Sequence, residues 1–310
     1  MTAKTYDVLA IGELLIDLIG TEPADSLATT SVYERHAGGS PANMVRNIQR
    51  LGGRGALVAT IGDDSTGRYL RRTLQSEGLP LKHLHVAQQV PTSLVLVSRT
   101  TGTPDFKAYR MADTYILPAH LPDELLAEAR VVHTTCFALS EQPARDSILS
   151  AARRAALLGA QLSIDLNYAP SLWPDREQAR ETVRRYCAHG ALVKCSLDDM
   201  HRLYGEGRPE GYFERLLGHG ARLVCLTLGS DGSRIATPEQ PEGVHYPAEP
   251  VAVRGEATGA GDAFWAGYLT AWLAGKSVAE CARAGGRMAG RKLASAEPLP
   301  RTLDAAFLYE

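Results

Sequence analysis

The sequence predicts an α/β fold, with a central and mostly parallel sheet that helices cover on both faces. Short β-rich runs alternate with helical patterns along nearly the whole chain, which is typical of βαβ units. We expect strands at 8–11, 56–61, 131–135, 161–164, 192–194 and 222–227, and helices at 41–51, 67–76, 144–158, 176–186 and 197–204.

One region interrupts this alternation. Two strand-like runs, 92–99 and 105–110, are joined by Thr-Thr-Gly-Thr-Pro, which signals a hairpin. Together with the strand-prone segment around 18–36, this hairpin predicts a small β lid over one edge of the sheet. Because the sequence has no repeats or low-complexity linkers, we expect one core spanning 1–310, with a discontinuous lid formed by about 18–36 and 92–112.

Composition and charge exclude several classes of protein. The chain has 310 residues, of which 45% are hydrophobic and 22% charged, as in a soluble protein with a large core. A net charge of −2 without a basic tract argues against nucleic acid or an anionic membrane as a partner. We find no long apolar run and no leader, so neither a spanning nor a secreted protein is expected. Well-separated cysteines fit reduced thiols in the cytoplasm and indicate no zinc site: Cys136, Cys187, Cys195, Cys225 and Cys281.

Polar residues follow most of the predicted strands at their carboxyl ends, where parallel α/β sheets bind ligands. Each of them, taken alone, is better explained as a loop or cap residue. Their shared placement instead predicts one crevice, lined by Asp17, Asp63, Asp165, Asn167, Ser196, Asp199, Thr227, Gly229 and Asp262.

The most informative motif is Thr258-Gly-Ala-Gly-Asp262, a run of small residues that leads directly into a helical pattern. Free backbone N–H groups at a helix start favour an anion, so Gly259, Ala260 and Gly261 are expected to form an anion hole. A carboxylate there repels an anion, but it is useful if it takes a proton from a hydroxyl that attacks a phosphorus. We therefore interpret Asp262 as a candidate catalytic base. A helix-start acid behind a tight glycine turn stays open as the alternative.

Two other nucleotide-binding motifs do not fit the sequence. A dinucleotide fingerprint requires Gly or Ala where Phe264 stands, and it belongs to the first βα unit. The run Gly275-Lys-Ser has Thr270 in place of the first P-loop glycine. Gly275 is better explained as a helix C-cap.

A second glycine-rich motif, Gly38-Gly39-Ser40-Pro41, precedes a predicted helix. The two glycines permit close approach of the backbone to a ligand. Ser40 before Pro41 is predicted to be the helix N-cap. Asn43, on the first turn, offers donors and an acceptor to a polyol. Capping explains Ser40 and Pro41 but leaves the other residues unexplained.

Taken together, these motifs resemble those of the PfkB/ribokinase-type carbohydrate kinases. Between the two glycine-rich motifs the resemblance includes Ile61-Gly-Asp63-Asp, Asp165-Leu-Asn167 and Thr227-Leu-Gly229-Ser-Asp-Gly232, so it covers essentially the whole chain. It implies a ribokinase-like fold and phosphorylation of a sugar hydroxyl that depends on ATP and Mg2+.

The resemblance also implies roles for individual residues. Asp262 would be the catalytic base, with the anion hole at Gly259, Ala260 and Gly261. The substrate contacts would be Asp17, Gly38, Gly39, Asn43, Arg110 and Asn167. The nucleotide site would be lined by Ser196, Thr227, Gly229, Gly232 and, beneath the adenine, Gly286. In this family the lid often forms a dimer interface, so the resemblance implies a homodimer through the lid.

Two departures from the family pattern concern cations. Where the family has Asn-x-x-Glu, which organises magnesium and phosphate, this chain has Ser196-Leu-Asp-Asp199. Aspartate is one methylene shorter than glutamate, so Asp199 is expected to reach Mg2+ through a water molecule. Glu256 stands where relatives carry an aspartate that helps to hold a monovalent cation, which leaves potassium activation open.

Within the family, the fructokinase branch is the most similar, on the segments 12–17 and 165–173 and on the Tyr109-Arg110 pair. We therefore expect the γ-phosphate to be transferred to a primary hydroxyl of fructose or a related hexose. A 2-keto-3-deoxygluconate kinase, with Lys107 or Arg110 facing the carboxylate, is one alternative. A nucleoside kinase and a non-catalytic sugar or nucleotide sensor are the others.

Overall fold

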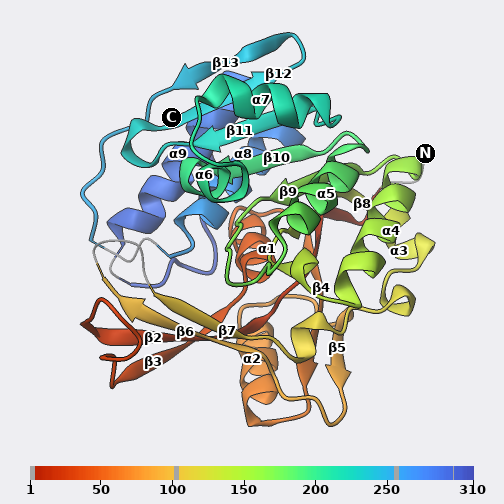
Figure 1. Cartoon of the computed structure of the whole chain (residues 1–310), viewed down its shortest axis with the longest axis vertical. Coiled ribbons are helices and arrows are strands. Elements are labelled where there is room, and N and C mark those ends of the chain that lie inside the picture. Colours follow the sequence, from red (N-terminus) through yellow and green to blue (C-terminus); the bar gives the residue numbers. More distant parts are fainter. Residues whose placement is uncertain (1–3, 101–104, 255–257, 296) are drawn as a thin grey trace.

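The main sheet of the protein is mostly parallel. The computed structural model describes residues 4–100, 105–254, 258–295 and 297–310. Within these ranges a nine-stranded sheet has the order β13 (Gln240–Tyr246), β12 (Ser233–Thr237), β11 (Leu223–Thr227), β10 (Leu192–Ser196), β9 (Gln161–Asp165), β8 (Ala129–Thr135), β1 (Tyr6–Ile11), β4 (Gly55–Gly62) and β5 (Leu84–Ala87). Neighbours from β11 to β5 pair in parallel, whereas β12 and β13 form an antiparallel edge. The expected α/β class is thereby confirmed (Figure 1).

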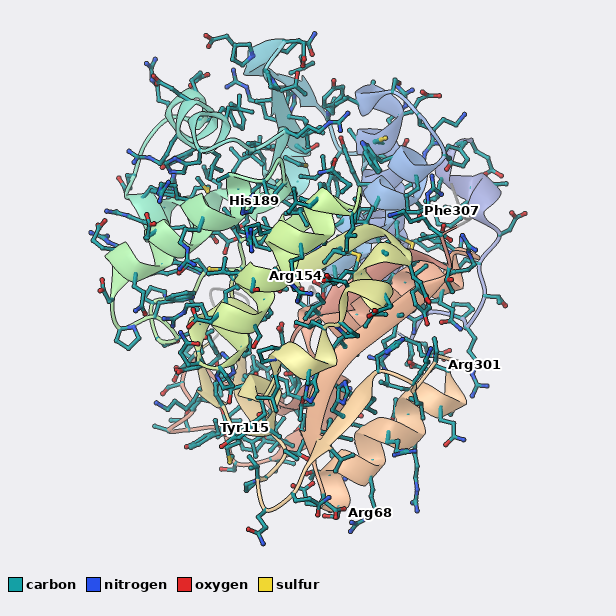
Figure 2. All side chains as sticks on the ribbon, turned by 90° about the vertical axis from the view of Figure 1, so that its right-hand side faces the viewer. Arg68, Tyr115, Arg154, His189, Arg301 and Phe307 are labelled. Carbon is teal, nitrogen blue, oxygen red and sulfur yellow. The ribbon has the colours of Figure 1, made fainter. Side chains whose placement is uncertain are left out.

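Helices cover both faces of this sheet. One face carries α1 (Ser40–Arg50), α2 (Ser65–Ser76), α8 (Ala260–Leu273) and α9 (Val278–Ala294). The other carries α3 (Asp123–Ala127), α4 (Ala144–Leu157), α5 (Arg176–Cys187), α6 (Leu197–Tyr204) and α7 (Pro209–Gly218). Figure 2 shows this from the side, with His189, just after α5, and Phe307, near the C-terminus, on opposite sides of the sheet.

Successive side chains along each central strand point to opposite faces of the sheet, so the protein has a hydrophobic core on each face. In β1, Leu9 and Ile11 pack into the core under α3 to α7, whereas Val8 and Ala10 face the helices of the other side. All four side chains are fully buried. The sequence of a strand that is covered on both faces is therefore a continuous apolar run.

A second sheet of four strands lies beside the main body (Figure 1). It has the order β3 (Tyr33–Gly38), β2 (Leu15–Pro23), β6 (Leu94–Arg99) and β7 (Phe106–Tyr109). The segments expected for a lid thus supply this sheet, although β2 begins before the predicted segment and β3 extends past it. Its function as a lid stays a prediction.

Every predicted strand and helix is present, with bounds within two residues of those expected. Among the strands and α-helices of the described ranges, β5, β12, β13, α3 and α7 were not predicted. The α9 sequence is rich in Gly and Ala, and its buried face packs against α8. In the described ranges no helix has the length and apolar character needed to cross a membrane.

Candidate active site

Asp262 lies in the first turn of α8 and contacts two residues from the start of α1. Its Oδ1 atom accepts a hydrogen bond of 2.6 Å from Ser40 Oγ, and its Oδ2 atom accepts one of 3.0 Å from Asn43 Nδ2. The first N–H groups of α8 have no partner within their own helix. The two glycine-rich motifs, 222 residues apart at Ser40 and Asp262, therefore meet at one carboxylate.

The predicted N-cap role of Ser40 is wrong. Helix α1 begins at Ser40, its N-cap residue is Gly39 at a φ of 106°, and no side chain caps it there. The Glu13 carboxylate instead accepts the Ser40 N–H at 3.1 Å, which satisfies a donor at the helix start. The Ser40 hydroxyl donates to Asp262.

Glu13 is a residue of the site that the sequence reasoning missed. Its side chain is buried between Ser40 and Thr135, whose hydroxyl donates to Oε2 at 2.9 Å. Burial raises the pKa of Glu13 to about 8, although hydrogen bonds and the charge of Arg110 oppose this rise. Its position two residues after the first strand, where ligands bind in parallel sheets, is the sequence signal that could have found it.

Asp17 and Gly38 lie against each other in the second sheet. A Cβ atom on Gly38 would stand 1.9 Å from Oδ2 of Asp17, so the carboxylate fills the space that a side chain would need. Asp17 belongs to β2 and not to the exit of the first strand, where it was expected. Burial raises the pKa of Asp17 to about 7, and the negative charge of Asp262 adds to this rise. The two carboxylates therefore repel each other across a shared space.

The carboxylate of Asp262 is buried among charges of both signs. Burial raises its pKa to about 6, and Asp165 adds to that rise. Hydrogen bonds from Ser40 and Asn43 and the charge of Lys194 act in the opposite direction. At neutral pH the group is mainly ionised, and it is a stronger base than an ordinary aspartate. This balance suits a general base that works near pH 7.

Lys194 is a second residue that the sequence reasoning missed. Its Nζ atom forms a buried ion pair with Asp165, at 3.1 Å from Oδ1 and 2.9 Å from Oδ2. Burial disfavours the charged ammonium, but Asp165 and Asp199 outweigh this effect, and the pKa of Lys194 is raised above its usual value. A lone lysine in an apolar strand, in register with Asp165 on the neighbouring strand, is the signal that could have found it.

Ser196 and Asp199 form a local capping arrangement at the start of α6. Ser196 Oγ accepts the Asp199 N–H at 3.1 Å, and Asp199 Oδ2 accepts the Ser196 N–H at 2.9 Å. Burial raises the pKa of Asp199 to about 6. No described residue donates to its Oδ1 atom, so this oxygen is free for another ligand. Thr227, on the neighbouring strand, is in register with Ser196.

The glycines predicted for the nucleotide site lie either in a tight turn or on an open helix surface. Gly229 and Gly232 form the turn between β11 and β12, with φ values of 61° and 91°. A Cβ atom on Gly232 would stand 2.2 Å from the carbonyl oxygen of Tyr246, so backbone packing alone requires glycine there. At Gly286 in α9, no described atom of another segment lies within 4 Å of a Cβ position, and the surface is open.

Asn167 and Arg110 meet at the backbone of Phe137, after β8. Asn167 Oδ1 accepts the Phe137 N–H at 3.0 Å, and Arg110 Nη1 donates to the Phe137 carbonyl at 3.0 Å. Arg110 also pairs with the buried Asp113 at 2.6 Å. Both side chains therefore have partners within the protein. Asp63, which was expected in the same crevice, is exposed and pairs with a surface arginine at 3.8 Å.

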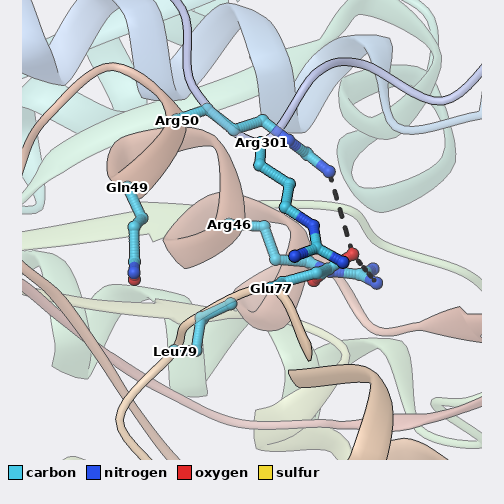
Figure 3. Close-up of a pocket in the computed structure, with 6 residues that line it drawn as sticks. All are labelled: Arg46, Gln49, Arg50, Glu77, Leu79 and Arg301. Atoms are coloured by element: carbon cyan, nitrogen blue, oxygen red, sulfur yellow. Dashed lines mark hydrogen bonds and ion pairs between the residues drawn. The ribbon is translucent and has the colours of Figure 1, made fainter. Parts of the chain in front are cut away.

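Arg46 connects the candidate site to a small pocket at the far end of α1. Its Nη1 atom donates to the Ala37 carbonyl at 2.9 Å and to Asn43 Oδ1 at 3.3 Å. Its other nitrogens bind both oxygens of Glu77, at 2.5 and 2.8 Å. Figure 3 shows Arg46 directed at Glu77, with Arg301 beside this pair. Arg46 therefore fixes the amide of Asn43, while the pocket contains none of the predicted site residues.

The side chains fit a magnesium ion that is held mainly by a nucleotide. Among the described residues, no group of three or more His, Cys, Asp or Glu side chains is arranged to hold a metal. Mg2+ usually binds one or two carboxylates together with phosphates and water. The free oxygen of Asp199 offers one such carboxylate. Glu256, on which the expectation about potassium rested, lies outside the described residues.

Known proteins are similar to this chain over most of its length. The model of the pfkB family carbohydrate kinase matches residues 5–297. The ATP-dependent 6-phosphofructokinase of Thermoanaerobacterium thermosaccharolyticum is 31% identical over 290 residues, which cover 94% of this chain and 88% of that protein. The probable fructokinase-2 of Arabidopsis thaliana is 32% identical over 289 residues, which cover 90% of this chain and 87% of that protein.

A solved structure shares the fold. The fructokinase of Halothermothrix orenii has a TM-score of 0.79 and 34% sequence identity, with 94% of this chain and 100% of that chain covered. This likeness confirms the ribokinase-like architecture that the resemblance implied. Both glycine-rich motifs, which meet at Asp262, lie within the matched residues. The chain therefore belongs to the pfkB family of carbohydrate kinases, and it is an enzyme of that class.

Proposed function

We propose that this kinase transfers the γ-phosphate of ATP to a primary hydroxyl of fructose or a related neutral hexose. One observation carries the proposal: a buried carboxylate with a pKa of about 6 lies at a helix start and contacts two residues of the other glycine-rich motif. An acid in that place is useful when a hydroxyl must lose a proton beside a phosphoryl group. The fructokinases among the similar proteins support the choice of sugar.

In the proposed step, Asp262 orients the sugar hydroxyl and accepts its proton. The hydroxyl oxygen bonds to the γ-phosphorus, and the bond from that phosphorus to the bridging oxygen breaks, so that ADP leaves with the electron pair. The amides of Gly259, Ala260 and Gly261 stabilise charge on the transferred group. Because Asn43 and Ser40 hold both carboxylate oxygens, Asp262 is oriented before the sugar arrives.

The sugar side of the site comprises the residues near Asp262 that would hold the other hydroxyls. Asp17 and Asn43 supply acceptors and donors, and Gly38 and Gly39 allow the backbone to approach closely. Asn167 contributes through the loop that it fixes at Phe137. Arg110 supports the same loop and acts on the substrate indirectly.

The nucleotide side comprises Ser196, Asp199, Thr227, Gly229, Gly232 and Gly286. Thr227 and the glycine turn would line the phosphates and ribose, and the open surface at Gly286 would lie beneath the adenine. Asp199 would hold magnesium through a water molecule, and the metal would neutralise phosphate charge. The second sheet would close over the sugar to exclude water and pair with the same sheet of a second subunit in a cytoplasmic homodimer.

A second candidate acceptor is fructose 6-phosphate, because one similar protein is an ATP-dependent 6-phosphofructokinase. A phosphate dianion in the sugar site needs a cationic partner. Arg46 and Arg110, which border the sugar side, are paired with Glu77 and Asp113. Neutral fructose is therefore the better fit.

Consumption of ATP in the presence of Mg2+ tests the proposal. The acceptors to compare are fructose, fructose 6-phosphate, 2-keto-3-deoxygluconate, ribose and adenosine, each at equal concentration with a no-acceptor control. We expect kcat/KM to be highest for fructose. A preference for fructose 6-phosphate would replace the acceptor, and binding of ATP without turnover on any member would favour a sensor.

A further inference from the structure

The ammonium of Lys194 is buried next to the loop of the proposed anion hole. Its Nζ atom is 2.8 Å from the position that a Cβ atom on Gly261 would take, so the absence of a side chain lets the charge approach the loop. Lys194 comes from the strand β10, whereas Gly261 lies in the first turn of α8. The contact therefore joins the middle of the sheet to the helix start that carries Asp262.

The hydrogen bonds of this ammonium leave one of its protons unassigned. Two protons are taken by the two oxygens of Asp165. No described residue accepts the third. A buried ammonium with an unused donor is costly unless a negative group arrives to accept it. An anion bound at the loop would lie on the side of Nζ that faces Gly261, where it could accept this proton.

The surrounding charges are predominantly negative. Asp165, Asp199 and Asp262 all raise the pKa of Lys194, and Lys194 in turn opposes the rise in the pKa of Asp262. A single ammonium thus attracts three carboxylates before any substrate is bound. A transferred phosphoryl group adds further negative charge at the loop, and in a buried site opposite charges a few Å apart interact strongly.

We propose that Lys194 is a positioning residue for phosphoryl transfer, a fixed cation that acts through the Gly261 loop and Asp262. It lets the carboxylate stay close to the anion that the hole would hold, despite the like charge of these two groups, and it offsets the charge of the group in transfer. This inference rests on the proposed kinase reaction and deepens it. Lysine carries its charge on a compact ammonium, and this ammonium occupies the space that a side chain at Gly261 would need.

A double-mutant cycle separates this role from simple neutralisation of Asp165. The variants are Lys194→Met, Asp165→Asn and the two combined, with Lys276→Met as the control, because that lysine pairs with Glu280 on the surface. We expect Lys194→Met to lower kcat by about 10²-fold with little change in the KM for the sugar, and Lys276→Met to leave both unchanged. The combined variant should have a kcat at least about 10-fold below that of Asp165→Asn.

Equal kcat values for Asp165→Asn and the combined variant would overturn the proposal, because Lys194 would then act only on its ion-pair partner. If Lys194→Met alone does not fold, the combined variant still gives the answer, since it leaves no unpaired buried carboxylate at residue 165.

A binding measurement keeps this inference distinct from the proposed function. The midpoint Tm of thermal unfolding is compared for Mg2+–ADP with and without aluminium fluoride, which mimics the group in transfer. We expect the fluoride to add stabilisation in the wild type and in Lys276→Met, and this addition to be lost in Lys194→Met. If the wild type does not phosphorylate the sugar, the proposed acceptor is wrong. The effect of fluoride on Tm would still test the role of Lys194. Fluoride stabilisation that persists in Lys194→Met, or is missing from the wild type, counts against the role of Lys194.

Discussion

At Asp262, hydrogen bonds join residues 222 and 219 positions apart, whereas at Asp199 they join residues three positions apart. The sugar side is thus formed only when distant segments have packed together. The proposed nucleotide side includes a helix cap and a glycine turn, whose hydrogen bonds are local. We expect substitutions on the sugar side to change chemistry more than local structure, and those on the nucleotide side to act through the metal and the nucleotide.

The largest effect is expected from Asp262→Asn. Asparagine preserves the shape of the side chain but cannot accept the proton, so kcat should fall by about 10²–10⁴-fold. The affinity for ATP, measured by calorimetry, should be nearly unchanged, because the hydrogen bonds of Asp262 go to Ser40 and Asn43 and not to the residues of the proposed nucleotide side. Near-normal turnover would remove Asp262 as the base.

Gly38→Ala should disturb the sugar side next most strongly. The new methyl group would stand 1.9 Å from Oδ2 of Asp17 and must displace that carboxylate. We expect the KM for the sugar to rise by about 10-fold or more, while the KM for ATP stays constant. Gly211→Ala, on the open surface of α7, is the matched control. An unchanged sugar KM would show that Asp17 does not hold the sugar.

On the nucleotide side, Asp199→Asn should affect metal use. Asparagine retains an oxygen for the Ser196 N–H, so the helix cap survives, but the charge offered to Mg2+ is lost. The Mg2+ concentration at half-maximal rate should rise by about 10-fold. Asp198→Asn is the control, since that exposed neighbour pairs with Arg202 across the helix surface. Equal Mg2+ curves for the two variants would exclude Asp199 from metal binding.

The smallest effect, and the sharpest test of the coupling at Asp262, concerns pH. A general base acts when it is deprotonated, so kcat/KM should fall as the pH drops through the pKa of Asp262, about 6. Ser40→Ala removes a donor that lowers this pKa, so the acidic limb should move to higher pH, with kcat reduced by about 5-fold. Because no side chain caps α1, the Tm should change little. If the acidic limb of the kcat/KM profile does not move in Ser40→Ala, a group other than Asp262 determines its pKa.

The sequence was sufficient for the features that depend on local patterns. The helix 197–204 was expected at its observed bounds, since the capping pair Ser196 and Asp199 is local. The same reasoning failed at Ser40, because its hydroxyl bonds Asp262 and its N–H bonds Glu13, and neither partner is near in sequence. Lys194 was overlooked for the same reason, since Asp165 lies on another strand. Long-range partners of polar groups are the part that a single sequence does not reveal.

The separation of Ser40 and Asn43 from Asp262 also bears on biosynthesis. A ribosome releases the chain from the N-terminus, so the strands β10 and β11 and the glycine turn after them leave it before the start of α8. A nascent or prematurely terminated chain that ends before residue 258 contains every strand of the main sheet but lacks α8, and with it the proposed base Asp262 and the loop Gly259–Ala260–Gly261. Under the proposed mechanism, such a product cannot transfer phosphate. The late position of Asp262 would then keep unfinished copies of the enzyme from consuming ATP.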